Sequence, residues 1–472
     1  MSWLLVGLIV LVVLVAIYDS TQRRHAVLRN FPVIGHFRYW LESIGPELRQ
    51  YIVADNDEER PFSRDQRRWV YSVSKQENDY FGFGTDNDLE QTPNYLIIKH
   101  ASFPLTEPRP GEPDYDPDYK IPGAKVIGEW RRRKRSFRPS SVINISGMSY
   151  GSLSGPATEA LNRGAKIAGC WHNTGEGGVS KYHQHGGDLV WQIGTGYFGC
   201  RDDQGRFSKE RFLETVEKNP RIQAIELKLS QGAKAGLGGV VPGSKVTREI
   251  AAIRGIPVGT TCLSPARHQA FSDVDSLLDF VESLAAESGL PVGIKSAVGQ
   301  MDFWHELVTS MARGNRGVDF VAIDGGEGGT GAAPLVFSDH VALPFRLAFS
   351  RVFQLFQEAG LDEKITFVGS GKLGFPEVAF QAFSMGCDLI ALAREPMLAI
   401  GCIQAQQCHS GFCPTGVATQ NRWLVRGLDP TVKAARCGNY IMTLRKEILR
   451  LSRACGIEHP HQAQPELLEV IG

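Results

Sequence analysis

The most constraining feature of this sequence is a series of short apolar segments that recur every 20 to 40 residues, with helical periodicity between them. Strands that alternate with helices in this way are typical of a parallel α/β fold. The candidate strands are Val142–Ser146, Cys170–Asn173, Leu189–Ile193, Ala224–Leu229, Pro257–Leu263, Val292–Ser296, Phe320–Asp324, Ile365–Gly369 and Leu389–Ala393. Pro257–Leu263 follows a Gly-rich loop so closely that we assign it to an insertion. The other eight strands predict a closed (β/α)8 TIM barrel with an N-terminal helical extension.

The N-terminal segment Trp3–Tyr18 consists only of apolar residues and Gly. As a helix it would extend about 24 Å, close to the hydrocarbon thickness of a bilayer. The basic residues come after it, in the wrong order for a cleaved secretory signal. They are Arg23, Arg24, His25 and Arg29. We therefore expect a single transmembrane helix, with the rest of the chain in the cytoplasm. The alternative, a buried helix of a soluble domain, conflicts with the lack of a polar face.

The composition shifts along the chain suggest five parts. They are a transmembrane anchor (1–20), a helical preface with a Pro-rich strap (21–125), the barrel (126–400), a cysteine segment (401–421) and C-terminal helices (422–472). Six prolines between residues 104 and 123 forbid a continuous helix there. The basic run Arg131–Arg135 is either a solvated face or a contact with anionic lipid. Lys plus Arg equals Asp plus Glu at 51 each, so we expect no nucleic-acid partner.

Glycine-rich segments follow the last predicted strands, where barrels of this class place their phosphate sites. Five of the seven residues after Asp324 are glycine, so backbone N–H groups there can approach a phosphate or a flat ring. The candidate cofactor-binding residues are Gly328, Gly329, Thr330, Gly331, Ser370, Gly371, Ala393 and Arg394. Arg394 supplies a charge-assisted contact or, alternatively, a salt bridge at the rim.

Lys295 ends the otherwise apolar run Val292-Gly-Ile-Lys295. A lysine that points from a barrel strand into the mouth is costly to desolvate unless an anion or an electron-rich ring receives it. A reduced flavin is such a receiver. A structural lysine that snorkels to solvent is the alternative.

Cys402, Cys408 and Cys413 form the pattern Cys-x5-Cys-x4-Cys, followed by Pro414. Three thiolates within twelve residues suit an iron–sulfur cluster with three protein ligands. Zinc, with His409 as a fourth ligand, is the alternative. The remaining cysteines are isolated, and nine in total is an odd number that suits a reducing compartment.

Two further Gly-rich loops carry charged or amide side chains. Gln231 and Lys234 lie three residues apart and could hold a dicarboxylate or a carbonyl oxygen. Glu176 lies in the second of these loops, with glycines on both sides. Ordinary turn chemistry explains either loop equally well.

Together these motifs resemble the FMN-binding, synthase-site domain of glutamate synthase large subunits, and more closely the shorter stand-alone members of the glutamate synthase-like family. The resemblance runs from about Pro46 to Asn421. Its carriers are Gly147-Met-Ser-Tyr-Gly-Ser-Leu-Ser154, Asn173-Thr-Gly-Glu-Gly-Gly178, Gln231-Gly-Ala-Lys234, Pro242-Gly243 with Lys245-Val246, Gly328-Gly-Thr-Gly-Ala332, and Gly401-Cys402 through Cys413-Pro-Thr-Gly-Val-Ala-Thr-Gln420.

The resemblance implies a barrel that binds FMN, with Met148 and Ser149 among the cofactor-binding residues, and a three-iron, four-sulfur (3Fe-4S) cluster on Cys402, Cys408 and Cys413. It also implies that Gln231, Lys234 and Arg254 match positions that bind 2-oxoglutarate, that Thr195 replaces a nearby serine, and that Glu176 belongs to the catalytic set. The implied reaction condenses ammonia with 2-oxoglutarate to 2-iminoglutarate, which the reduced flavin N5 converts to glutamate. Electrons would arrive through the cluster, from a donor protein such as ferredoxin.

The sequence also departs from the large synthases. We expect no glutaminase domain, because Met1 leads directly into the apolar segment. Leu237, Val240 and Val179 stand where the large enzymes carry polar or acidic residues, so free ammonia or another amine could be the nitrogen donor. Two alternatives remain: a membrane-tethered electron-transfer flavoprotein, or a related amine-using synthase that acts on another substrate.

Overall fold

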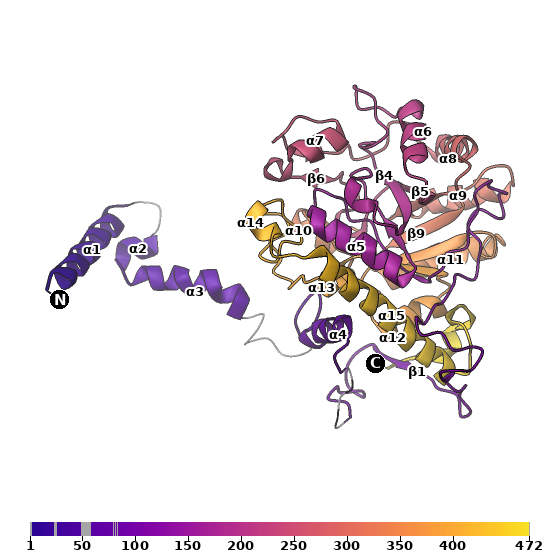
Figure 1. The fold of residues 1–472 in the computed structure, drawn as a ribbon, viewed down its shortest axis with the longest axis horizontal. Helices are drawn as coiled ribbons and strands as arrows, with labels where there is room; N and C mark the ends of the chain where they lie inside the picture. Colours follow the sequence, from indigo (N-terminus) through magenta and orange to yellow (C-terminus); the bar gives the residue numbers. More distant parts are fainter. Residues whose placement is uncertain are drawn as a thin grey trace. The chain divides into compact units, whose positions relative to one another are not determined.

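Eight parallel strands close into a barrel in the computed structural model, which describes residues 2–22, 26–48, 58–78, 80, 82 and 84–471 (Figure 1). In spatial order the strands run β10-β11-β2-β3-β4-β5-β8-β9, and β9 pairs with β10. They are β2 (Ile143–Ile145), β3 (Trp171–Asn173), β4 (Asp188–Ile193), β5 (Ile222–Lys228), β8 (Val292–Ser296), β9 (Phe320–Asp324), β10 (Thr366–Ser370) and β11 (Leu389–Leu392). The predicted TIM barrel is confirmed, and the observed strand ends lie within two residues of the predicted ones.

The insertion between β5 and β8 is also confirmed. It holds the antiparallel pair β6 (Val240–Val241) and β7 (Cys262–Leu263), which lies outside the barrel. Helix α7 (Arg248–Arg254) connects these two strands. The predicted strand Pro257–Leu263 therefore shrinks to its last two residues.

Helices surround the barrel, and three further α-helices follow its last strand in the sequence (Figure 1). They are α5 (Gly155–Ala168), α6 (Lys209–Lys218), α8 (Val274–Ser288), α9 (Asp302–Ala312), α10 (Leu335–His340), α11 (Phe345–Glu358), α12 (Pro376–Ser384), α13 (Arg394–Ala399), α14 (Arg422–Val425) and α15 (Pro430–Ala454). Short 3₁₀ helices lie at Lys181–His183, Gly232–Lys234, Gly243–Lys245, Pro460–Gln462 and Pro465–Leu467. Ser154 caps the N-terminus of helix α5, because its hydroxyl accepts the Ala157 N–H. Gly169 caps the C-terminus in the left-handed conformation.

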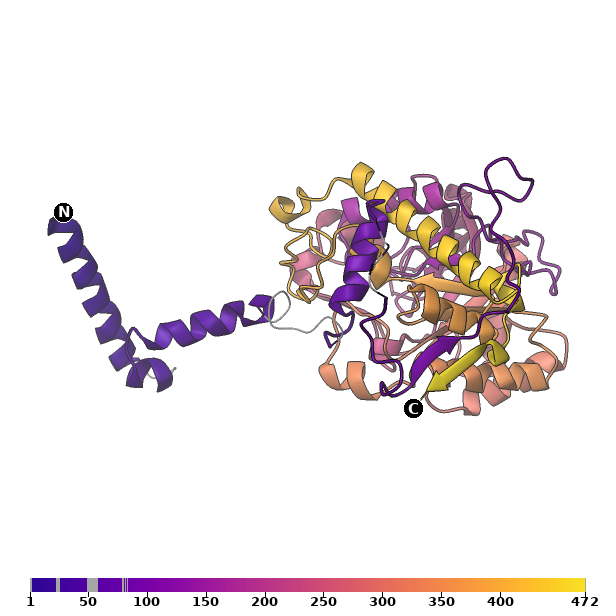
Figure 2. The same ribbon diagram turned by 90° about the horizontal axis from the view of Figure 1, so that it is seen from below.

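Helix α15 packs along α5 because small residues let the two helices approach closely. A Cβ at Gly164 would lie 2.6 Å from Cys437 Cβ, and one at Gly438 would lie 2.6 Å from Ile167 Cγ2. The buried Arg445 of α15 donates to the carbonyls of Ala168 and Asp118 at 2.8 Å each. It thereby ties the Pro-rich strap to the barrel. At the chain end, β12 (Leu468–Ile471) pairs antiparallel with β1 (Tyr95–Ile98), as the adjacent arrows in Figure 2 show.

The basic run at Arg131–Arg135 fits neither sequence interpretation in full, because Arg131, Arg133 and Arg135 all donate hydrogen bonds to the protein. Arg133 Nε donates to Asp319 Oδ2 at 2.9 Å, and its NH2 group donates to Glu282 Oε1 at 3.0 Å. Asp319 in turn accepts the N–H of Val292 at 2.7 Å, at the start of β8. Arg131 donates to the Gly314 carbonyl at 2.9 Å. These arginines close the end of the barrel opposite the mouth.

The chain divides into two compact units, residues 1–68 and 69–472. The first holds α1 (Ser2–Thr21), α2 (Ala26–Asn30) and α3 (Gly35–Leu48), and α4 (Arg64–Ser74) crosses the boundary. Within α1, Trp3–Thr21 has a mean hydropathy of 2.5, so by length and composition it is long and apolar enough to cross a membrane. Arg23, Arg24 and His25 lie outside the described residues.

Candidate functional site

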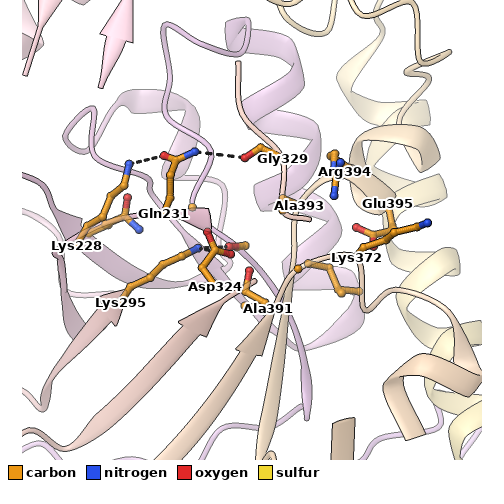
Figure 3. A pocket seen from close by; sticks show the side chains of 17 residues that line it. Lys228, Gln231, Lys295, Asp324, Gly329, Lys372, Ala391, Ala393, Arg394 and Glu395 are labelled. Carbon is orange, nitrogen blue, oxygen red and sulfur yellow. Dashed lines mark hydrogen bonds and ion pairs between the residues drawn. The ribbon is translucent and has the colours of Figure 1, made fainter. Parts of the chain in front are cut away.

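A polar pocket opens at the C-terminal ends of the barrel strands, where TIM barrels place their active sites (Figure 3). Its lining comes from the ends of β2, β4, β5, β8, β9, β10 and β11. The lining residues are Ser146, Gly147, Gln192, Lys228, Gln231, Lys295, Asp324, Gly328, Gly329, Ser370, Gly371, Lys372, Ala391, Leu392, Ala393, Arg394 and Glu395. Four cationic side chains face two carboxylates, so the pocket suits a ligand with negative charge.

Lys295 projects into this pocket from β8, next to Asp324 of β9 (Figure 3). Its ammonium donates to Ser146 Oγ at 3.2 Å and lies 3.6 Å from Asp324 Oδ1. Burial raises the pKa of Asp324, but Lys295 and the Gly232 N–H outweigh it and hold that pKa below its usual value. Asp324 is therefore a carboxylate that orients Lys295, and the snorkelling alternative fails because Lys295 is only 6% exposed.

Lys228, at the end of β5, connects the pocket to the loop after β3. Its ammonium donates to Glu176 Oε1 at 2.8 Å and to Gln231 Oε1 at 2.7 Å. The Gln231 amide then donates to the Gly329 carbonyl at 3.3 Å, which continues the chain into the Gly-rich loop (Figure 3). Three loops that are distant in sequence are thus joined by one hydrogen-bonded chain.

Glu176 is surrounded by three cations. Burial raises its pKa, but Lys228, Lys234 and Arg254 together lower it, so the net direction is downward. Space for the carboxylate comes from two glycines, because a Cβ at Gly194 or Gly239 would lie 2.7 Å or 2.4 Å from a Glu176 oxygen. The cluster therefore carries an excess of two positive charges next to the pocket.

The two cations farther from the pocket are both buried. Burial, followed by repulsion from Lys228, lowers the pKa of Lys234 to about 8, although Glu176 opposes the shift. Arg254 donates to the Tyr150 carbonyl at 3.1 Å and lies 5.0 Å from the ring centroid of Phe198. Its Nε has no hydrogen-bond partner among the described residues. An unpaired buried guanidinium donor is costly, so this position favours an anionic ligand.

The loop after β9 is rich in glycine because neighbouring segments of the chain leave little room for side chains there. A Cβ at Gly232 would lie 1.8 Å from the Gly325 carbonyl oxygen, so the loops after β5 and β9 cross backbone to backbone. A Cβ at Gly329 would lie 2.7 Å from Arg394 Cδ. Arg394 donates to the Glu327 carbonyl of the same loop, and Gly371 adopts a φ of 128° beside it. This cradle and the excess of positive charge fit the phosphate and flat ring of FMN.

The predicted site residues divide between the pocket and its surroundings. The pocket includes Gln231, Lys295, Gly328, Gly329, Ser370, Gly371, Ala393 and Arg394. Lys234, Arg254 and Glu176 form the adjacent charge cluster, and Ser149 Oγ lies 3.5 Å from the Arg254 NH2 group. Met148 packs against Gly175.

The other predicted residues lie outside the pocket lining. Thr195 donates its hydroxyl to the Pro265 carbonyl at 2.6 Å, and Thr330 donates to the Ala332 carbonyl at 3.4 Å. Gly331 lies in open space, since a Cβ on it would have Ser152 Cβ as its nearest neighbour, 4.0 Å away.

Nine lining residues were not among the predicted site residues: Ser146, Gly147, Gln192, Lys228, Asp324, Lys372, Ala391, Leu392 and Glu395. Lys228 carried a usable signal, because it is a lysine at the C-terminal end of an apolar strand, just as Lys295 is. Gln192 carried one as well, since an amide inside a predicted barrel strand needs a buried partner. Its Nε2 donates to Glu226 Oε1 at 2.7 Å.

The cysteine segment is only partly arranged as predicted. Burial raises the pKa of Cys413, but the N–H groups of Ala418, Thr415 and Val417 and the Thr415 hydroxyl lower it overall. Burial and the neighbouring Cys413 raise the pKa of Cys408, and Lys245 opposes that shift. In the part of the chain that the structure describes, no three His, Cys, Asp or Glu side chains are grouped to hold a metal ion. The three thiols are therefore not assembled as one ligand set, with or without His409.

Comparison with known proteins places these features in a family. The family model described as "Conserved region in glutamate synthase" matches residues 124–458. The glutamate synthase large subunit-like protein YerD of Bacillus subtilis is 39% identical, with 96% of this chain and 91% of that protein covered. An archaeal glutamate synthase [NADPH] of Methanocaldococcus jannaschii is 37% identical over 68% of this chain, which spans 60% of that relative's length.

Among solved structures, a mutant flavocytochrome b2 with pyruvate bound aligns with a TM-score of 0.46 and 12% identity over 91% of each chain. A similarity at that level says nothing about ligand or activity.

Proposed function

This chain belongs to the glutamate synthase family, and from that premise we propose that it is an FMN-dependent oxidoreductase that converts 2-oxoglutarate to glutamate. Ammonia adds to the C2 carbonyl and water leaves, which gives 2-iminoglutarate. Two electrons and two protons then reduce the C=N bond to the amine of glutamate. The proposal goes beyond the family assignment, because the chain spans only 60% of the archaeal relative that is named glutamate synthase.

The observation that carries this proposal is the cluster of Lys228, Lys234 and Arg254 around Glu176. Three cations and one carboxylate leave an excess of two positive charges, which balances the two negative charges of a dicarboxylate at neutral pH. A buried excess of that size is unfavourable without an anion, so the cluster is a binding site rather than a structural network. It lies beside the pocket through the Lys228–Gln231 hydrogen bond.

Each residue of the cluster has a distinct proposed role. Arg254 and Lys234 offer two positive charges to the substrate carboxylates. Gln231 and Lys228 face the pocket, so they hold the C2 substituent and stabilise negative charge that develops there. Glu176 keeps Lys228 oriented by accepting its hydrogen bond. Thr195 supports the loop through Pro265 rather than by direct contact.

FMN would occupy the Gly-rich cradle. Gly328, Gly329, Ser370, Gly371 and Arg394 would hold its phosphate, and Lys295 would contact the electron-rich edge of its ring, with Met148 and Ser149 nearby. When bound, the flavin supplies the electron pair for reduction of the imine. The chain's own residues orient the imine and exclude water from it.

The decisive experiment starts from the purified holoenzyme, photoreduced without oxygen. We expect addition of 2-oxoglutarate with ammonium to reoxidise the flavin and produce glutamate. A flavin that stays reduced, with no glutamate formed, would overturn the synthase assignment. Methylammonium in place of ammonium tests the related amine-using synthase, and an artificial electron acceptor tests the electron-transfer alternative.

Lys234→Ala separates binding of the cofactor from the reaction. We expect turnover to be abolished while FMN stays bound, because Lys234 does not line the flavin pocket. The electron donor is a separate question: reduced ferredoxin and NADPH, each added to the oxidised enzyme, show which of them reduces it.

The 3Fe-4S cluster on Cys402, Cys408 and Cys413 is a separate proposal. It is supported by the N–H and hydroxyl donors at Cys413 and by Lys245 near Cys408, since iron–sulfur thiolates commonly accept such hydrogen bonds. The arrangement of the three side chains does not support it. No step above depends on the cluster. Iron and acid-labile sulfide measured in anaerobically purified protein test the proposal, and their absence would reject it.

We also propose that Trp3–Thr21 anchors the chain as a single-pass span with the catalytic unit in the cytoplasm, and that the chain follows the five-part division given above. The support is the length and exposure of this helix. Resistance of the protein to alkaline extraction from membranes tests the anchor, and protease digestion of sealed vesicles tests the side on which the barrel lies.

A further inference from the structure

The segment that follows the apolar helix carries an apolar surface that the rest of its compact unit leaves exposed. On α3 and just before it, the exposed apolar residues are Ile34 (78%), Phe37 (60%), Trp40 (56%), Leu41 (41%) and Leu48 (37%). Their spacing places all five on one face of a helix. Val27 of the preceding helix α2 and Phe31, just after that helix, line an open groove together with Ile34, Phe37 and Leu41.

Polar side chains border the apolar face of α3. Arg38 and Glu42 line the same groove and pair with each other at 2.8 Å, and both side chains are exposed. Ser43, on the side of the helix opposite Leu41, donates its hydroxyl to the Trp40 carbonyl at 2.8 Å. An apolar stripe of this extent with charged residues along its edge is typical of helices that lie in a membrane interface.

Helix α3 is held at the end of α1 by a buried carboxylate. Asp19, in the last turn of α1, is fully buried and accepts the Val33 N–H at 2.9 Å and the His36 Nε2–H at 3.0 Å. The start of α3 is therefore fixed at the level of Asp19. The span Trp3–Thr21 is about 28 Å long at 1.5 Å per residue, which matches the hydrocarbon core of a bilayer, so Asp19 would lie at its boundary.

Aromatic residues mark both ends of the span. Tyr18 is 68% exposed at the level of Asp19, and Trp3 is 87% exposed at the opposite end of α1. Phe37 and Trp40 stack with ring centroids 5.6 Å apart on the apolar face of α3. Tyr and Trp are enriched at membrane–water interfaces, where an apolar ring meets a wet surface.

We propose that α2 and α3 form an interfacial elbow that lies in the plane of the membrane, with Ile34, Phe37, Trp40 and Leu41 in the boundary between lipid headgroups and acyl chains. The occupant of the apolar groove is the lipid itself. The proposal rests on the anchor proposed above, because the continuity of the exposed apolar surface from α1 to α3 identifies the occupant. The elbow gives the chain a second membrane contact beyond the span.

Photo-crosslinking of the full-length holoprotein in phosphatidylethanolamine–phosphatidylglycerol vesicles tests this proposal. Benzoylphenylalanine is placed at Phe37 on the apolar face, at Ser43 on the polar face, or at Val12 in α1, and adducts with labelled lipid are counted after illumination. We expect roughly ten-fold more lipid adduct at position 37 than at position 43.

The three positions separate the two proposals. Lipid adducts at position 12 but not at position 37 would overturn the elbow and leave the anchor intact. Adducts at position 37 without any at position 12 would reject the span and keep the elbow as a surface-bound segment. Equal adducts at positions 37 and 43, or a crosslink at position 37 to a second copy of the chain, would also overturn the elbow.

Discussion

Lys228 donates to Glu176 across 2.8 Å although Lys228 ends β5 and Glu176 lies in the loop after β3. Both side chains are largely buried, at 11% and 14% exposure, and the same ammonium also contacts Gln231. Because Lys228 contacts both Glu176 and Gln231, it fixes the loop after β3 relative to the loop after β5. This pair therefore sets the geometry of the proposed substrate site.

Lys228→Met should abolish most of the activity without unfolding the protein. The change removes the cation that faces the pocket and leaves Glu176 under the positive charges of Lys234 and Arg254. We expect kcat/KM to fall by about 10²-fold or more, as is typical when a transition-state charge partner is lost. Lys209→Met is the matched control, because Lys209 pairs with Glu287 on an exposed surface. Equal effects of both variants on kcat/KM would contradict the role of Lys228.

The affinity for 2-oxoglutarate should weaken as the pH rises past about 8. Burial and Lys228 lower the pKa of Lys234 to about 8, so below that pH it is cationic and above it neutral. The substrate dicarboxylate then loses a charge partner, and KM should rise up to about ten-fold per pH unit until the bound-state pKa is reached. Initial rates measured at several pH values check this.

Lys234→Arg provides the control for that pH dependence, because a guanidinium stays charged throughout the range. We expect its KM to be higher at neutral pH but nearly flat from about pH 7 to about pH 9. A wild-type KM that is also flat over this range would show that Lys234 does not bind substrate as a cation.

Gly329→Val should lower the FMN content of the purified protein. A Cβ at this position would lie 2.7 Å from Arg394 Cδ, so the Arg394 side chain would have to move away from the loop that it holds. Gly331→Val is the matched control in the same loop, because the nearest neighbour of a Cβ there is 4.0 Å away. The flavin absorbance relative to protein measures the outcome, and equal flavin loss in both variants would reject Gly329 as part of the cradle.

The barrel could be predicted from the sequence because each strand is a short, fully buried apolar run bounded by turn residues. Val292–Ser296 and Phe320–Asp324 were placed without error for this reason. The insertion was less well defined, because β6 and β7 have two residues each and their pairing depends on a contact across 20 residues of loop and helix. Local patterns carry no signal for such a contact.

The site could be predicted where the binding groups form a local sequence motif. Gly328 and Gly329 in the loop after β9 and Arg394 after β11 are examples. It could not be predicted where the partners come from different strands. Lys228 reads locally as the end of a strand, and only the closed barrel brings it to Glu176 and Gln231. Arg131 and Arg133 were misjudged for the same reason, since their carboxylate and carbonyl partners lie more than a hundred residues away in sequence.

Arg133→Met should destabilise the barrel unit. Arg133 is 9% exposed and pairs with Asp319 and Glu282, so its loss leaves a buried carboxylate without its cation at the start of β8 and β9. Breaking a buried pair of this kind typically costs about 3–5 kcal/mol. Arg132→Met, at the exposed neighbouring position, should stay within about 0.5 kcal/mol of the wild type. Thermal unfolding of the two variants checks this, and similar transition temperatures would mean that the buried ion pairs contribute little to the closed end of the barrel.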